Sequence, residues 1–344
     1  MKVELPLGKL RNDLLRDVVF PNLGVEDMRV VYGPREGFDS AVLEYDHDRY
    51  LVVATDPTLG VPEETFGFFS YHFAASDVAV FGARPRWLVV DILLPPGSEK
   101  GFLGKAMRDL NTECWKYGSA IIGGHTGVYP GVAEPTATTT AMGLVRKDEL
   151  KLPLAKPGDK IIVTGKVGLE FAVSAAYFRE RELRKFLSFR EIARLKKSFR
   201  LETVVPDAFT AKPFVRGMHD ATEGGLTALH EIADNSGLGF RVYSEKLKLD
   251  PLVERVLNFY DLEPWSISST GTLIAITPPE KSKYLIDELH KNGIGAFEIG
   301  EFTSDESRLL IEGVSEREFP DFESDPYIGI YEGFTERFGK KHNT

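Results

Sequence analysis

Short runs of β-branched and apolar residues alternate along the first half of the chain with segments in which apolar residues recur at helical spacing. Within the first 150 residues the pattern predicts strands at 28–32, 40–45, 50–55, 87–94, 119–122 and 135–145, and helices at 8–19, 71–81 and 106–117. The polar residues 46–49 read as a hairpin connection, and Gly123 and Gly124 follow the end of a strand. Strands that alternate with helices indicate an α/β or α+β half.

The pattern of residue types changes near Asp148, and the turn at 156–159 begins a second half. There the pattern predicts strands at 160–165 and 272–276, a long helical region from 169 to 197, and helices at 226–235, 252–259 and 282–292. We therefore expect an α/β protein of two domains, 1–150 and 151–335, followed by a frayed tail at 336–344.

Size and composition narrow the class of protein. A chain of 344 residues exceeds what one core usually supports, which agrees with two domains. Hydrophobic residues make up 42% and charged residues 27%, as in ordinary globular proteins. No apolar run is long enough to span a membrane and the first residues lack a signal-peptide core, so the cytoplasm is the expected location, with no membrane partner.

Charge and cysteine content exclude further classes. A net charge of −10 repels nucleic acid, and the basic run 179–200 reads as a solvated amphipathic helix, so we expect no nucleic acid partner. The single cysteine, Cys114, rules out an intramolecular disulfide and fits a packed helix position better than a catalytic thiol.

The helix predicted at 71–81 contains the most unusual residue of the chain. It is apolar, ends at Gly82 and cannot continue through Pro85, yet it has Asp77 in its middle. A carboxylate in an apolar helix is costly unless a cation, N–H groups or a ligand compensates it. Asp77 is therefore a candidate site residue.

Three further aspartates lie beside Gly, Ser or Thr at element ends or in glycine turns. These are Asp39, Asp56 and Asp220. Carboxylate oxygens suit Mg²⁺, and the N–H groups of glycine turns suit phosphate. Each residue alone is more often a cap or turn residue, so the argument depends on their joint context.

That context resembles the aminoimidazole ribonucleotide synthetase (PurM-like) superfamily. The ordered motifs that carry the resemblance are Gly37 to Val42, Ala54 to Asp56, Ser76 to Ala79, Gly82 to Pro85, Gly123 to Thr126, Pro157 to Asp159, Val163 to Gly165 and His219 to Leu226. They cover almost the whole chain.

The resemblance implies a two-domain fold whose N-terminal sheet domain forms a homodimer and whose C-terminal α/β domain completes a cleft for ATP and Mg²⁺. It implies metal ligands at Asp39, Asp56 and Asp77, and a catalytic set at Asp77, His125 and Asp220. Cofactor contacts are expected from Asp39, Asp56, Gly123, Gly124, Lys166, His219, Gly224 and Gly225. Lys166 could equally be an exposed turn lysine, and His125 could equally be a structural hydrogen-bonding residue.

Within the superfamily, the second half is most similar to the hydrogenase maturation factor HypE. HypE proteins end in a cysteine that carries a carbamoyl group, whereas this sequence ends in Asn343-Thr344. Phe38 precedes Asp39 where many relatives have a second acid, and His125 stands where many have Asp or Glu. Fewer carboxylates should weaken Mg²⁺ binding, and histidine is a poor Mg²⁺ ligand.

Three functions remain open on these residues. The first is an ATP- and Mg²⁺-dependent enzyme that phosphorylates or activates a small substrate. The second is a nucleotide-binding accessory protein with reduced catalysis that docks on a partner in a maturation pathway. The third is thiamine monophosphate kinase activity, against which the incomplete acidic pair at Phe38 and Asp39 counts.

Overall fold

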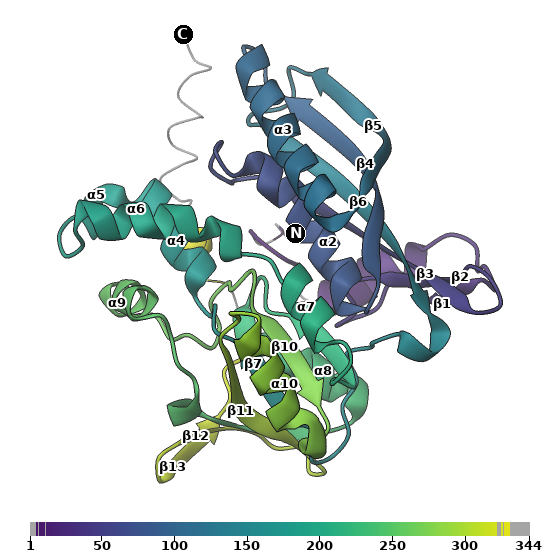
Figure 1. Cartoon of the computed structure of the whole chain (residues 1–344), viewed down its shortest axis with the longest axis vertical. Helices are drawn as coiled ribbons and strands as arrows, with labels where there is room; N and C mark the ends of the chain where they lie inside the picture. The colour runs from purple at the N-terminus through teal and green to yellow at the C-terminus, as the bar shows by residue number, and fades with distance from the viewer. Residues whose placement is uncertain (1–4, 6, 11, 322–324, 326, 331–344) are drawn as a thin grey trace, which may run out of the picture.

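The computed structural model describes residues 5, 7–10, 12–321, 325 and 327–330. The predicted tail at 336–344 lies outside the described residues. Two halves, each a sheet with helices against it, are joined near residue 150 (Figure 1). A two-domain α/β fold is thus what the sequence pattern predicted.

The N-terminal sheet has six strands in the order β1-β2-β3-β6-β4-β5, and only β4 and β5 run parallel. Their bounds are β1 Val30–Tyr32, β2 Ala41–Glu44, β3 Arg49–Thr58, β4 Arg84–Leu94, β5 Ala120–Val128 and β6 Thr136–Arg146. The predicted hairpin between β2 and β3 is confirmed. Helices α2 (Phe66–Val80) and α3 (Lys100–Tyr117) lie along one face of the sheet (Figure 1).

The first predicted helix and the fifth predicted strand need correction. Helix α1 covers only Asn12–Leu14 and continues as a π-helical turn, Leu15–Val19, and a short 3₁₀ turn, Phe20–Asn22. Strand β5 runs on through the expected glycine turn to Val128. Gly124 (φ 147°) lies against β4, where an added Cβ would be 1.8 Å from the carbonyl oxygen of Val90. Glycine is required there by the approach of two strands.

The C-terminal sheet has seven strands in the order β13-β12-β9-β11-β7-β10-β8, with only β12 and β9 parallel. Their bounds are β7 Lys160–Thr164, β8 Gly217–Asp220, β9 Gly239–Tyr243, β10 Leu273–Thr277, β11 Ala296–Thr303, β12 Arg308–Glu312 and β13 Ser315–Glu318. The predicted strands at 160–165 and 272–276 are confirmed. The other five were missed because several are short or polar, as in Ser315–Glu318.

The long helical region predicted from 169 to 197 is broken into three helices. They are α4 (Leu169–Phe178), α5 (Glu180–Leu183) and α6 (Phe189–Lys197). Ser188 starts α6 with a capping box that includes Glu191. The remaining helices are α7 Val205–Ala211, α8 Ala228–Ser236, α9 Pro251–Phe259 and α10 Pro279–Lys291. Within the described part of the chain, no helix has both the length and the apolar character needed to cross a membrane.

Helix α2 connects the two halves. Nearly all of its residues are buried, and it packs against β3 and β6 on one side and against α7 and β8 on the other. Gly67 lets α3 approach closely, since a Cβ there would be 2.2 Å from the carbonyl oxygen of Ala106. Asp77 is 8% exposed on this helix and interacts through charge with Asp56 of β3 and Asp220 of β8, so it lies where both halves meet.

Candidate metal centre

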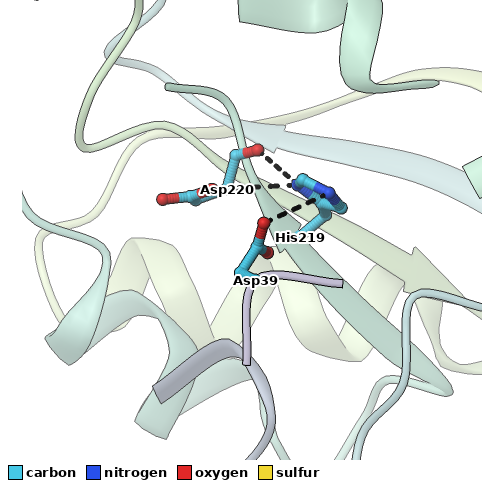
Figure 2. A group of neighbouring side chains, drawn as sticks. All are labelled: Asp39, His219 and Asp220. Atoms are coloured by element: carbon cyan, nitrogen blue, oxygen red, sulfur yellow. Dashed lines mark hydrogen bonds and ion pairs between the residues drawn. The ribbon is translucent and has the colours of Figure 1, made fainter. Parts of the chain in front are cut away.

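Four aspartates from separate elements lie close together between the two halves. Asp39 precedes β2, Asp56 lies on β3, Asp77 lies on α2, and Asp220 ends β8. Single ligand atoms from Asp39, His219 and Asp220 lie within 4.8 Å of one another (Figure 2). Asp56 and Asp77 share a side-chain hydrogen bond, and both sense the charge of Asp39. The four residues therefore form one electrostatic cluster.

His219 is the cation buried inside this cluster. Its Nε2 lies 3.6 Å from Asp39 Oδ1 and 3.5 Å from Glu231 Oε2, and its Nδ1 is 2.6 Å from the carbonyl oxygen of Asp220. Burial opposes the charged form, yet Asp39, Glu231 and Asp220 raise the pKa of His219 to about 10. In the metal-free protein the charged imidazole of His219 pairs with the carboxylates of Asp39 and Glu231.

The pKa values of three of the aspartates are raised above the usual value for this residue. Burial and the nearby carboxylate of Asp39 raise the pKa of Asp56 to about 6 and that of Asp220 to about 8. Burial and the charge of Asp56 raise the pKa of Asp77 well above its usual range. Carboxylates that crowd in this way require either protons or a cation between them.

The donor set fits Mg²⁺. All four aspartates supply hard oxygen atoms, and Mg²⁺ takes carboxylates, phosphate oxygens and water. Asp39 Oδ2 is buried without a hydrogen-bond partner, which leaves an oxygen free to bind a cation. The ligand atoms of Asp39, His219 and Asp220 have the spacing of a metal site, and Asp56 and Asp77 lie near enough to interact with these aspartates through charge.

Two further charged residues belong to the cluster and escaped sequence analysis. Glu231 on α8 pairs with His219, and although burial works against it, His219 and Lys9 lower the pKa of Glu231 to about 2. Lys9 Nζ lies 3.8 Å from Glu231 Oε1. Neither residue stands in a recognisable motif. Lys9 follows a glycine, and Glu231 lies one helical turn after Thr227, which are common settings for surface residues.

The structure does not bring His125 to the cluster within one chain. Asp56 aligns through Thr139 and Val90 with Gly124, so His125 lies three strands from β3, about 14 Å at the usual strand spacing. His125 is the residue after Gly124, and successive side chains of a strand point to opposite faces. It therefore projects from the face of the sheet opposite to that of Asp56. There its Nε2 lies 2.6 Å from the hydroxyl of Tyr129.

Lys166 also lies apart from the four aspartates. Its Nζ is 2.8 Å from Asp207 Oδ2 and donates to the carbonyl oxygen of Thr203 at 3.2 Å. Asp207 is fully buried and Lys166 nearly so, so the ammonium neutralises a buried carboxylate. The phosphate contact predicted for Lys166 would require this ion pair to break.

The glycine turn at Gly224 and Gly225 is occupied by the chain itself. The Gly224 N–H donates to Asp325 Oδ2 at 2.8 Å, and the same oxygen accepts from Ser268 Oγ at 2.6 Å. Gly225 has φ 59° and lies so close to Ile267 that a Cβ would be 2.2 Å from its carbonyl oxygen. These glycines thus anchor the C-terminal segment, and the Gly224 N–H predicted to meet phosphate is already engaged.

Phe38 and Cys114 have packing positions. Phe38 contacts Tyr32 and Phe81, with ring centroids 5.5 and 5.9 Å apart, so it faces the core beside the cluster. Cys114 is buried on α3, and burial raises the pKa of its thiol to about 11. Such a thiol is inert, which agrees with the structural role predicted for Cys114.

Comparison with known proteins places this geometry in a family. Residues 37–145 match the N-terminal domain of AIR synthase related proteins, and residues 156–311 match the C-terminal domain. Carbamoyl dehydratase HypE of Azotobacter vinelandii is 30% identical over 282 residues, which is 79% of this chain and 80% of that protein. A putative hydrogenase expression/formation protein of Methanocaldococcus jannaschii is 26% identical and covers 91% of this chain and 94% of its own length.

The fold agrees with these relatives. The crystal structure of HypE from Escherichia coli superposes with a TM-score of 0.71 at 23% sequence identity, covering 80% of this chain and 87% of that one. The order of the domains, the two sheets and the sequence matches all indicate the same family. The chain belongs to the AIR synthase related, PurM-like superfamily and is close to HypE.

Proposed function

We propose that this protein is an ATP- and Mg²⁺-dependent enzyme that phosphorylates or activates a small substrate. The observation that carries the proposal is the convergence of Asp39, Asp56, Asp77 and Asp220 from both halves of the chain. Among the described residues, these four and Glu231 face only two cations, His219 and Lys9. Buried carboxylates in such excess are compensated either by protons or by a divalent metal.

In this proposal Asp39, Asp56, Asp77 and Asp220 hold Mg²⁺, which when bound neutralises the charge of the nucleotide phosphates. Asp56 and Asp77, which share a hydrogen bond in the metal-free protein, would both have to be ionised to hold the metal. His219 and Glu231 keep Asp39 and Asp220 oriented through their ion pairs. Catalysis then rests on positioning and charge neutralisation around the transferring phosphoryl group.

Solved structures of the same fold support a nucleotide. HypE has been determined in complex with ATP, and a thiamine monophosphate kinase, AaThiL, with AMPPCP and TMP. HypE has also been determined in complex with HypF, which supports a protein partner in a maturation pathway for this chain. Cys114 is too deeply buried to carry a substrate group, and the proposal takes the activated acceptor to be a separate molecule.

Calorimetric titration with ATP, in the presence and absence of Mg²⁺, tests the proposal. We expect ATP to bind with Mg²⁺ at least about tenfold more tightly than without it, because phosphates meet uncompensated carboxylates when the metal is absent. Formation of ADP separates an enzyme from an accessory protein, which would bind without turnover. Thiamine monophosphate as acceptor tests the kinase activity. Failure to bind ATP with Mg²⁺ would contradict the proposal.

We further propose that the N-terminal sheet pairs with a second copy through the face that α2 and α3 leave open. Val89, which is 36% exposed, lies on this face beside Thr140, and Leu93 and Met142 are half-buried there. Strand β5 adds an exposed edge with Ile122 and Val128 exposed. An apolar face and an open edge on one sheet are typical of an association surface.

The Val89→Glu substitution should convert a dimer to a monomer. A carboxylate in the middle of a paired apolar face would be buried without a partner, whereas in the monomer it remains in water. Sedimentation velocity should show the unaltered protein at twice the monomer mass and the variant at the monomer mass. Val314→Glu, at a fully exposed valine in a turn, is the matched control and should remain dimeric. A monomeric unaltered protein would refute this surface.

A further inference from the structure

The N-terminal segment 7–10 lies beside the carboxylate cluster and is fixed there by two contacts. The Lys9 N–H donates to Glu223 Oε1 at 2.7 Å. Gly8, with φ 89°, lies so close to Glu223 and Ile328 that an added Cβ would be 2.6 Å from Glu223 Oε1 and 2.5 Å from Ile328 Cδ1. Only glycine fits this position without displacing the segment.

Ile328 is itself held in place by the C-terminal segment. Asp325 is 2% exposed and accepts hydrogen bonds from Gly224 and Ser268, and its carbonyl oxygen accepts from the Ile328 N–H at 3.1 Å. The two ends of the described chain therefore meet over the glycine turn of the C-terminal half. The position of Lys9 follows from this arrangement, since Gly8 is held between the two segments.

Lys9 presents its ammonium to the carboxylate cluster while remaining partly open to solvent. Its Nζ lies 3.8 Å from Glu231 Oε1, and its side chain is 46% exposed. The charges of Glu231, Asp39, Asp220 and Glu223 outweigh its partial burial and raise its pKa. Among the described residues, Lys9 is the cation of the cluster that a ligand can reach from outside, because His219 is buried.

We propose that Lys9 is the residue that binds the terminal phosphates of the nucleotide, with Gly8 and the C-terminal segment as the parts that position it. This inference rests on the proposed function. Lys9 pairs with Glu231, which is outside the proposed set of metal ligands, and its partly exposed ammonium could also contact a ligand at the aspartates. The aspartates would hold Mg²⁺, which would supply positive charge for the phosphates, so Lys9 would contact the phosphates rather than the nucleoside.

The Lys9→Met variant tests the proposal by calorimetry with MgATP, AMP and Mg²⁺ alone. We expect its affinity for MgATP to fall about tenfold, the usual value of a charge-assisted contact, and its affinity for AMP to stay unchanged. Its affinity for Mg²⁺ without nucleotide should rise, because a competing cation has been removed. Lys9→Arg should retain most of the MgATP affinity.

Two further variants separate this role from a structural one. Gly8→Ala leaves every charge in place but displaces the segment, and it should lower MgATP affinity as Lys9→Met does. Lys147→Met is the matched control, because Lys147, like Lys9, forms an ion pair with one glutamate, Glu44. It should change the affinity neither for MgATP nor for AMP. Equal losses for MgATP and AMP in Lys9→Met, or no loss for either, would overturn the proposal for Lys9 alone. Failure of the unaltered protein to bind MgATP would overturn the proposed function as well.

Discussion

Asp77→Asn should abolish Mg²⁺-dependent ATP binding while the protein stays folded. Removing even an outer contact of a metal site commonly costs 10- to 100-fold in affinity, so loss of a ligand should weaken Mg²⁺ binding by at least about 100-fold. The amide keeps the shape of the carboxylic acid and can still hydrogen-bond to Asp56. Because the pKa of Asp77 lies well above its usual range, the neutral side chain resembles the form that the metal-free protein prefers.

The measurements are calorimetric titrations with Mg²⁺ and MgATP, together with the melting temperature of the metal-free protein. We expect the melting temperature of Asp77→Asn to be close to that of the unaltered protein near neutral pH, since the amide replaces a carboxylic acid that is neutral there. Asp148→Asn, at an exposed carboxylate paired with Arg146, is the matched control and should bind like the unaltered protein. Unchanged metal affinity in Asp77→Asn would exclude this residue as a ligand.

Sequence pattern was a good guide to the long elements of this fold and a poor guide to the short ones. The helix around Asp77 and the hairpin before Asp56 were evident because their apolar residues follow a clear period over many positions. Strand β8, only four residues long, has no such period and takes its conformation from pairing with β10. It carries His219 and Asp220, so a strand that no local pattern reveals positions two of the three residues whose ligand atoms lie within 4.8 Å of one another.

The candidate site was predictable to the extent that its residues stand in motifs. Asp39, Asp56, Asp77 and Asp220 were expected together from the ordered resemblance; they interact through charge in the structure, and their joint binding of a metal stays a prediction. The side chain of His125 points away from the aspartates because side chains alternate between the two faces along β5. The sequence did not show that β5 continues through Gly124. Lys9 and Glu231 were missed because their roles depend on tertiary contacts between segments more than 200 residues apart.

The metal-free protein should lose stability as the pH rises through the range in which its aspartates ionise. An aspartate in an unfolded chain has a pKa of about 3.9. In the folded protein the pKa of Asp56 is about 6 and that of Asp220 about 8. Between about pH 4 and pH 8 the folded state therefore binds more protons than the unfolded chain. The stability that these protons supply is complete below about pH 4 and is lost as the pH rises through 6 and 8.

Mg²⁺ should reverse this loss and bind more tightly at higher pH. The metal requires ionised carboxylates, so each proton that it displaces makes its affinity rise about tenfold per pH unit. Between about pH 6 and pH 8 we expect the affinity to rise at least about 100-fold, because Asp220 and part of the Asp56–Asp77 pair must release protons. Calorimetry in two buffers of different ionisation enthalpy measures the number of protons released. The same pH series on Asp148→Asn is the control, and an affinity that is independent of pH, without proton release, would show that the metal does not bind among these aspartates.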